Sequence, residues 1–118
     1  MKNTKEKGTY GEQIALDHLR KRQYEVLDCN WRHSRWEIDI IARRSSKLIF
    51  IEVKTRNMDS YAEEVTLVSK KQQENLFRAA SKYMENQNYT GDIRFDVIKI
   101  LLNTDRTYQL EHFEDAFY

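Results

Sequence analysis

Residues 48–54 are predicted to form a strand that starts apolar on both faces and ends in charge. The run Leu48–Ile51 has no polar side, which is typical of a strand in the middle of a sheet. Glu52 and Lys54 follow on the same face as Phe50, because side chains alternate along a strand. Charges at the end of a buried strand are costly without partners. The chain is therefore expected to build a sheet around this strand, with a polar site at one end of it.

The flanking segments predict an α/β domain with the order α-β-β-β-α-β-(β), in which helices flank a central mixed sheet. We expect a helix from Thr9 with Glu12 completing its capping box, strands over 24–30, 36–43 and 48–54, a second helix capped by Ser69 and Gln72, a strand over 93–102 and an edge strand over 108–112. Residues 1–8 are expected to be loose and flexible, residues 57–66 have no clear period, and Gly91 is the expected turn residue after the second helix. The length of 118 residues fits a single domain, 1–118.

The charge balance argues against a general nucleic-acid coat protein. The net charge is only +1, so any contact with nucleic acid must come from local basic clusters. The candidates are Arg32, Arg35, Arg56, Lys70 and Lys71. A second explanation, that each of these side chains is simply a solvated surface charge, accounts for it about equally well.

Cysteine usage and hydrophobic runs bear on where the protein works. Cys29 is the single cysteine, so no disulfide forms within the chain and a reducing, cytoplasmic location fits best. The N-terminus has no long apolar run, and we expect neither a signal peptide nor a membrane span.

The turn after residue 43 makes the second and third strands an antiparallel hairpin that places Asp39 opposite Glu52. Like charges directly opposite one another are destabilising unless something positive lies between them. Two carboxylates, the main-chain carbonyl of Val53 and waters are oxygen ligands that Mg²⁺ accepts. The pattern predicts a site for Mg²⁺ or Mn²⁺, and a partly exposed ion-pair cluster of Asp39, Glu52 and Lys54 remains the alternative.

A metal at this place would suit phosphodiester cleavage. It would bind a phosphate oxygen and lower the pKa of a bound water, while Lys54 would orient that water or stabilise the transition state. Glu37 shares a face with Asp39. It is a further ligand, a partner of Lys54 or an exposed charge.

Several stretches resemble the YraN-like family of small bacterial proteins, in the same order and along nearly the whole chain. They are Gly11-Glu12, Asn30-Trp31-Arg32, Glu37-Ile38-Asp39-Ile40-Ile41-Ala42, Phe50-Ile51-Glu52-Val53-Lys54-Thr55-Arg56 and Arg94-Phe95-Asp96-Val97. The fourth stretch is the most specific. The resemblance implies a restriction-endonuclease-like fold with a PD-(D/E)-x-K motif, arranged as in Holliday-junction resolvases.

Carried over residue by residue, the resemblance makes Asp39 the first Asp of the motif, Glu52 its second acid and Lys54 its lysine. It also implies that Glu12 is the acid that the first helix supplies to the same site, a role that can coexist with helix capping. Three places depart from the pattern. Ile38 stands where the motif's name has Pro, and Trp36 stands where the family usually has Gly. The loop after Arg56 usually carries a Gly where this chain reads Ser60-Tyr61-Ala62, and these changes bear on loop shape and substrate choice.

Arg94 and Asp96 share a face of the 93–102 strand and are expected to form an internal ion pair rather than to support the site.

Two functions follow as hypotheses. The first is a Mg²⁺-dependent endonuclease that cuts branched or structured DNA, working as a homodimer with repair or recombination proteins. The second is a non-catalytic nucleic-acid-binding or repair-adaptor domain on the same fold. The intact acid-acid-lysine set favours the first, and the near-neutral charge mildly favours the second.

Overall fold

The computed structural model describes residues 4–58 and 68–118. Its elements, in chain order, are α1 (Thr4–Lys21), β1 (Glu25–His33), β2 (Trp36–Arg44), β3 (Lys47–Asn57), α2 (Lys70–Gln87), β4 (Ile93–Leu102) and β5 (Tyr108–Phe113). This order confirms the predicted α/β class, including the final edge strand, and is consistent with a restriction-endonuclease-like fold. Most of the 57–66 segment lies outside the described residues.

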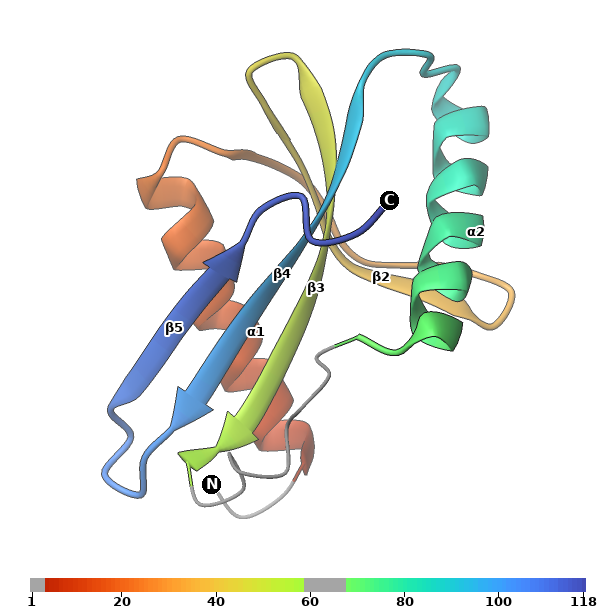
Figure 1. Cartoon of the computed structure of the whole chain (residues 1–118). Coiled ribbons are helices and arrows are strands. Elements are labelled where there is room, and N and C mark those ends of the chain that lie inside the picture. The colour runs from red at the N-terminus through yellow and green to blue at the C-terminus, as the bar shows by residue number, and fades with distance from the viewer. Residues whose placement is uncertain (1–3, 59–67) are drawn as a thin grey trace.

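The sheet has the strand order β1-β2-β3-β4-β5, with β3 in its centre as its apolar sequence predicts (Figure 1). Only β3 and β4 run parallel; the other neighbours are antiparallel. Parallel neighbours need a long crossover connection, and α2 lies within this one. The short β2–β3 turn uses Ser45 and Ser46 with φ of 53° and 65°, which matches the two-residue turn that a twisted hairpin favours.

The two helices cover opposite faces of the sheet. On one face Ala15 and Leu19 of α1 pack with Ile49, Ile51 and other buried side chains of the sheet. On the other face Leu76 and Ala80 of α2 pack with Phe50 and its neighbours. Each helix buries one apolar stripe, so the core consists of two layers separated by the sheet. Among the described residues, no helix is long and apolar enough to cross a bilayer.

The sheet forks partway along β2 and β3. Their pairing runs from Arg44 and Lys47 to Ile40 and Ile51. Beyond that point β2 stays with β1, while β3 stays with β4 as far as Asn57. Figure 1 shows the β1–β2 arm crossing behind the first turns of α2 and the β3–β4–β5 arm extending away from that helix. The fork opens next to Asp39 and Glu52.

The start of α1 differs from the sequence prediction. The helix begins at Thr4, so Thr9 lies inside it and cannot be its N-cap; the predicted capping box with Glu12 is wrong. Lys5, Glu6 and Lys7 are good helix formers and extend the helix toward the N-terminus. Residues 4–8, expected to be loose, are helical.

The prediction for the start of α2 is confirmed, and the prediction for its end is wrong. Ser69 caps the helix and Gln72 completes its capping box, as expected. At the other end Asn88 takes the left-handed conformation with φ of 54°, and Gly91 has no positive φ. Asn is a residue other than glycine that takes this conformation at helix ends, and Asn88 is met first along the chain.

Candidate functional site

Asp39 lies at the fork and makes the first contact beyond the β2–β3 ladder. Its Oδ2 accepts a 2.8 Å hydrogen bond from the main-chain N–H of Val53. Glu52 lies close enough for its charge to act on the Asp39 carboxyl group. The structure therefore brings Asp39 and Glu52 together at the point where the strands separate.

This arrangement raises the pKa of the Asp39 carboxyl group. Burial and the neighbouring charge of Glu52 raise the pKa of Asp39 to about 8, although the hydrogen bond from Val53 lowers it. Two carboxylates that share one poorly solvated place cannot both ionise freely. A proton or a cation between them relieves the repulsion.

Lys54 completes the acid-acid-lysine set. Its Nζ lies 3.2 Å from Oε2 of Glu52, and the two side chains are 10% and 19% exposed. Lys99 of β4 pairs with Lys54 in the parallel ladder and is also buried. The sequence analysis did not single out Lys99, since only the pairing of β3 with β4 brings it beside Lys54.

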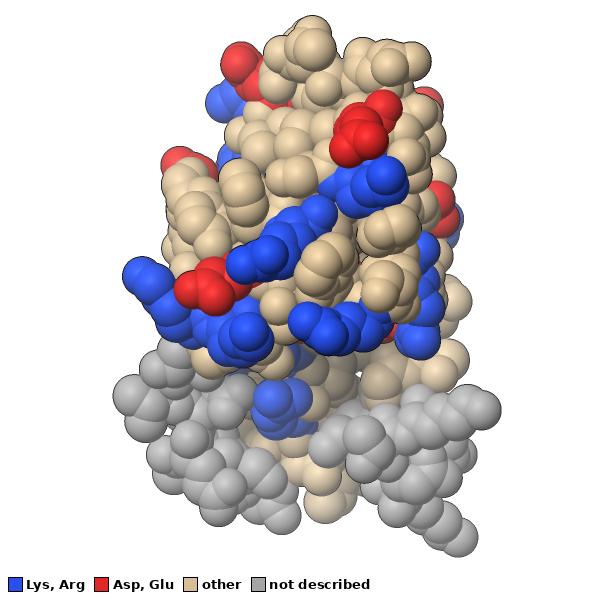
Figure 2. Space-filling view, turned by 90° about the vertical axis from the view of Figure 1, so that its right-hand side faces the viewer, with Lys and Arg blue, Asp and Glu red and all other residues tan. Residues whose placement is uncertain are grey.

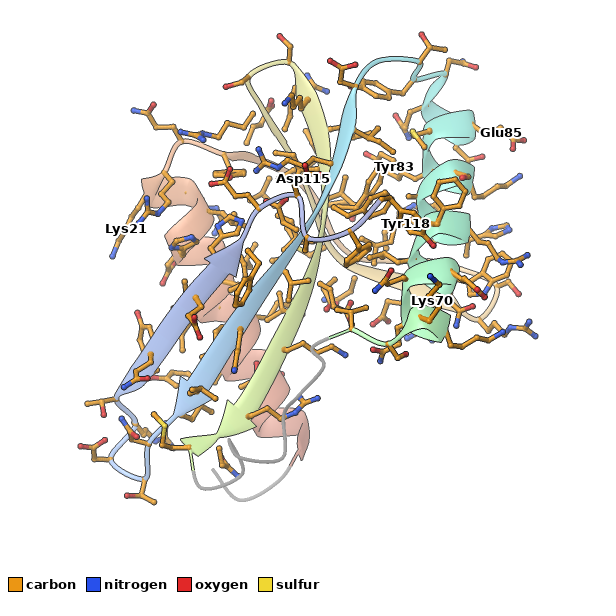
Figure 3. All side chains as sticks on the ribbon, in the orientation of Figure 1. Lys21, Lys70, Tyr83, Glu85, Asp115 and Tyr118 are labelled. Atoms are coloured by element: carbon orange, nitrogen blue, oxygen red, sulfur yellow. The ribbon has the colours of Figure 1, made fainter. Side chains whose placement is uncertain are left out.

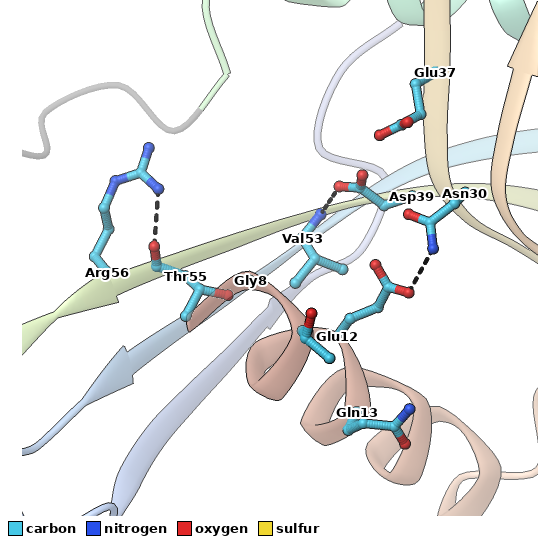
Figure 4. A pocket seen from close by; sticks show the side chains of 10 residues that line it. Gly8, Glu12, Gln13, Asn30, Glu37, Asp39, Val53, Thr55 and Arg56 are labelled. Carbon is cyan, nitrogen blue, oxygen red and sulfur yellow. Dashed lines mark hydrogen bonds between the residues drawn. The ribbon is translucent and has the colours of Figure 1, made fainter. Parts of the chain in front are cut away.

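A large cleft of about 640 Å³ opens on the α1 side of Asp39. Glu12 and Glu37 both line it, and Figure 4 shows Glu12 reaching up from α1 below Asp39. The Glu12 carboxylate accepts a 2.8 Å hydrogen bond from the side-chain amide of Asn30. Glu12 thus belongs to the cleft, with its carboxylate held by Asn30.

A close approach of α1 to β3 sets the depth of this cleft. A Cβ atom added at Gly11 would lie 2.0 Å from Oγ1 of Thr55. Only glycine lets the helix approach the strand so closely. Because Glu12 follows Gly11, this contact also determines where the Glu12 side chain enters the cleft.

The donor set fits one hard divalent ion held mainly by Asp39 and Glu52. Mg²⁺ is usually bound by one or two carboxylates, with waters completing its coordination. The N–H and C=O groups of one strand residue point to the same side, so the Val53 carbonyl is directed toward the fork as well. Among residues 4–58 and 68–118, no group of three or more acidic, His or Cys side chains has ligand spacing. Glu12 is therefore not gathered into one ligand group with the carboxyl pair.

The basic residues suggested by the sequence surround the site unevenly. Arg56 lines the large cleft, where it donates to the Thr55 carbonyl, and Arg35 lines a smaller cleft on the α2 side. Arg32 is exposed and forms a salt bridge with Glu37. Lys70, at the start of α2, is exposed like the adjacent Lys71 (Figure 3). Figure 2 shows Lys and Arg side chains spread across the face that carries α2, with few acidic ones between them.

Four polar residues of the large cleft were not predicted from the sequence as site residues, namely Thr9, Gln13, Asn30 and Thr55. Asn30 has a signal that could have been noticed, because an Asn inside a strand is suited to a positive φ, here 52°. Gln13 and Thr55 carry no such signal. They line the cleft only because α1 lies against β3 at Gly11.

The comparisons with known proteins agree with the resemblance noted in the motifs. The model of the uncharacterised protein family UPF0102 matches residues 11–100. A UPF0102 protein of Christiangramia forsetii is 39% identical over 113 residues, which cover 96% of this chain and 94% of the relative. One from Clostridium botulinum (strain Alaska E43) is 39% identical over 118 residues, covering 98% and 97%. The chain therefore belongs to the UPF0102 family, the YraN-like family that its motifs resemble.

Proposed function

We propose that this protein is a metal-dependent nuclease that hydrolyses nucleic-acid phosphodiesters, with branched or structured DNA as its substrate. The observation that carries the proposal is the meeting of Asp39 and Glu52 in a poorly solvated place, where the pKa of Asp39 rises to about 8. A divalent cation relieves that repulsion and is the cofactor that phosphodiester hydrolysis uses.

Each residue of the site has a role in this chemistry. Asp39 and Glu52, with the Val53 carbonyl, would hold Mg²⁺ or Mn²⁺. The bound ion would neutralise charge on the phosphate and supply a more acidic water. Lys54, held 3.2 Å from Glu52, donates to the attacking water or to a phosphate oxygen and stabilises the negative charge that develops. Glu12 and Glu37 line the cleft as outer carboxylates, which accept hydrogen bonds from waters around the ion.

The substrate approach follows from the positions of the basic side chains. Arg56 is at the large cleft, so a phosphate on that side of the cut meets a guanidinium group, while Arg35 stands at the small cleft on the other side. Lys70 and Lys71 would contact the backbone further along. Cutting both strands of a branch point requires two sites, so we infer a homodimer. Repair or recombination proteins are the expected partners, and Cys29, the single cysteine, suits the reducing cytoplasm.

One observation favours a second candidate function. In the described part of the chain, Glu12 does not join Asp39 and Glu52 in a group of three ligands. A non-catalytic nucleic-acid-binding or repair-adaptor domain would not need such a group. It would still use the basic side chains.

Cleavage assays with matched variants test the proposal. The protein is incubated with plasmid, single-stranded and four-way-junction DNA, in Mg²⁺, in Mn²⁺ and in EDTA. We expect metal-dependent cutting that falls at least about a hundredfold in Asp39→Asn and in Lys54→Met. Glu85→Gln removes an exposed carboxylate from the far end of α2, and this control should cut normally.

Calorimetric titration with Mn²⁺ separates the two candidate functions. The nuclease proposal expects one Mn²⁺ bound per chain in the parent and none in Asp39→Asn. DNA binding with neither Mn²⁺ uptake nor cutting would support the adaptor and exclude the nuclease.

A further inference from the structure

A second, smaller cleft of about 160 Å³ lies on the α2 side of the carboxyl pair. Its walls include Arg35, Trp36, Glu37, Glu52, Gln72 and Asn75. Glu52 lines this cleft, whereas its neighbour Asp39 lines the large one. The carboxyl pair thus stands between the two clefts, and a group seated in the small cleft lies directly beside the site proposed for the phosphodiester.

The size and the walls of the small cleft select a flat, compact ligand. Pockets for drug-sized molecules have volumes of about 300 to 1,000 Å³, so this cleft suits a single small ring system. Trp36 provides an aromatic wall, and the Arg35 guanidinium carbon lies 5.8 Å from the centre of its ring. Tryptophan rings and guanidinium planes are the surfaces on which unpaired nucleobases stack.

The charges in the small cleft favour a base over a phosphate. Glu37 is paired with Arg32, and Glu52 is paired with Lys54. The carboxylate oxygens of both residues are acceptors, which disfavour a phosphate but accept hydrogen bonds from the amino group of a base. The side-chain amide of Asn75 can both donate and accept, as the edge of a base requires.

We propose that the small cleft binds one unpaired nucleobase of the DNA strand whose phosphodiester lies at Asp39 and Glu52. The proposal rests on the proposed function and deepens it. The substrate class becomes DNA that presents an unpaired base next to the cut, as a branch point, a bulge or a flap does. Extruding such a base requires less energy than extruding a paired one, so the cleft selects structure rather than sequence.

Binding measurements in EDTA test the cleft without any cutting. Three duplexes of equal length are compared: one with a single bulged 2-aminopurine, one with an abasic residue at the bulge, and one fully paired. We expect the parent protein to bind the base bulge about tenfold more tightly than the abasic bulge, the size of one base–aromatic stack. The fluorescence of 2-aminopurine should change on binding, as the base moves from the DNA onto the indole.

Variants of the aromatic wall supply the controls. Trp36→Leu should abolish the tenfold preference, and Trp36→Phe, which keeps a ring, should retain most of it. Tyr108→Leu removes an exposed aromatic side chain from β5 and should leave the preference intact. If thermal melting shows that Trp36→Leu does not fold, Asn75→Ala replaces it and should reduce the preference severalfold.

The outcomes distinguish this inference from the proposed function. Equal binding of the base bulge and the abasic bulge by the parent protein overturns the inference, even if metal-dependent cutting is observed. A base preference that depends on Trp36, without cutting in Mg²⁺ or Mn²⁺, supports the cleft and overturns the nuclease. A failure to bind any of the duplexes overturns the inference as well.

Discussion

Asp39 experiences opposing influences that decide its protonation at neutral pH. Burial and the neighbouring Glu52 favour the neutral acid, whereas the Val53 N–H, 2.8 Å away, favours the carboxylate. The balance raises the pKa of Asp39 to about 8. Near neutral pH the folded protein therefore holds a proton here that an unfolded chain would release. A divalent cation would take the place of that proton.

The raised pKa predicts that Asp39 lowers stability as the pH rises. A group whose pKa is higher in the folded state binds more protons there, so stability is lost between its unfolded value of 3.8 and its folded value of about 8. Asp39→Asn keeps an acceptor for Val53 but cannot ionise. We expect equal melting temperatures for variant and parent near pH 4. Each unit of pKa shift is worth about 1.4 kcal/mol, so the variant should melt several degrees higher at pH 8.5.

Metal addition provides the control for this prediction. At pH 8.5 saturating Mn²⁺ should raise the melting temperature of the parent, since a ligand that binds only the folded state stabilises it by about 2.7 kcal/mol at a hundred times its Kd. The Asn variant should not respond. A difference between the two proteins that stays constant from pH 4 to pH 8.5 would contradict the raised pKa.

At the scale of elements, the contact of Gly11 with Thr55 fixes α1 on β3. An added Cβ would lie 2.0 Å from Oγ1 of Thr55 and 2.9 Å from its Cβ. Gly11→Ala should therefore force the helix outward and lower the free energy of unfolding by about 1–3 kcal/mol. Gly8→Ala is the matched control in the same helix, because nothing lies within 4 Å of its added Cβ.

Urea denaturation measures both alanine variants. Gly8→Ala should raise the free energy of unfolding by up to about 1 kcal/mol, the difference in helix propensity between alanine and glycine. Equal gains from both substitutions would show that α1 does not rest on Thr55. In that case the position of Glu12 in the large cleft would need another explanation.

A buried charge cluster joins β4 to four other parts of the fold. Asp96 is fully buried, accepts two hydrogen bonds of 2.8 Å from Arg94, and forms a 2.8 Å hydrogen bond with His112 of β5. The Asp115 N–H also donates to it. His112 reaches His18 of α1, and Arg94 reaches the Tyr24 hydroxyl group. The internal ion pair predicted for Arg94 and Asp96 is confirmed, but its extension to the histidines was not foreseen.

Removing the charge of Asp96 should lower the free energy of unfolding more than removing any one contact of the cluster. Breaking a buried pair leaves an uncompensated charge and costs about 3–5 kcal/mol, so Asp96→Asn should lower the free energy of unfolding by a large part of that range. Tyr24→Phe deletes only the hydroxyl group bonded to Arg94 and should cost about 1 kcal/mol. Urea denaturation at pH 7 measures both variants.

The pH dependence of Asp96→Asn gives an independent check. Burial alone would raise the pKa of Asp96, but the hydrogen bonds from His112, Arg94 and Asp115 outweigh it and lower the pKa. Its stabilising contribution is therefore present above about pH 4, the usual range of an Asp, and is lost as the pH falls through its folded pKa. The difference between parent and variant should shrink in acid. A difference that grows there would contradict the lowered pKa.

The strands and helices also show which parts of the site could be predicted from the sequence. The short turn at Ser45 and Ser46 fixes the hairpin register, so the meeting of Asp39 with Glu52 followed from local rules. The fork did not, because it depends on β3 leaving β2 to continue with β4. The small cleft depends on the packing of α2 over β2. Both depend on contacts between segments far apart in the chain, and the local spacing of apolar residues does not reveal such contacts.

At the scale of the whole molecule, the basic side chains are unevenly distributed over the surface, although the net charge is only +1. The outward face of α2 carries Lys70, Lys71 and Arg78, and Figure 2 shows basic side chains prevailing over this face. The α2 face also borders the small cleft, which contains Gln72 and Asn75. Phosphate contacts made here would guide a strand toward the carboxyl pair despite the near-neutral total.

Two double variants that lower the net charge by the same amount test whether DNA binding depends on where the basic residues lie or only on the total charge. Lys70→Gln/Lys71→Gln removes two charges beside the small cleft, and Lys21→Gln/Arg22→Gln removes two at the end of α1 on the opposite side of the molecule (Figure 3). Each lost phosphate contact lowers the slope of log K against log salt concentration by about 0.9 on duplex DNA. In filter-binding titrations between 50 and 200 mM salt, roughly the range over which such contacts matter, the α2 variant should therefore lose up to about 2 in slope, and the α1 variant should keep the parental slope. Equal losses would mean that only the total charge matters and that DNA does not cross the face of α2.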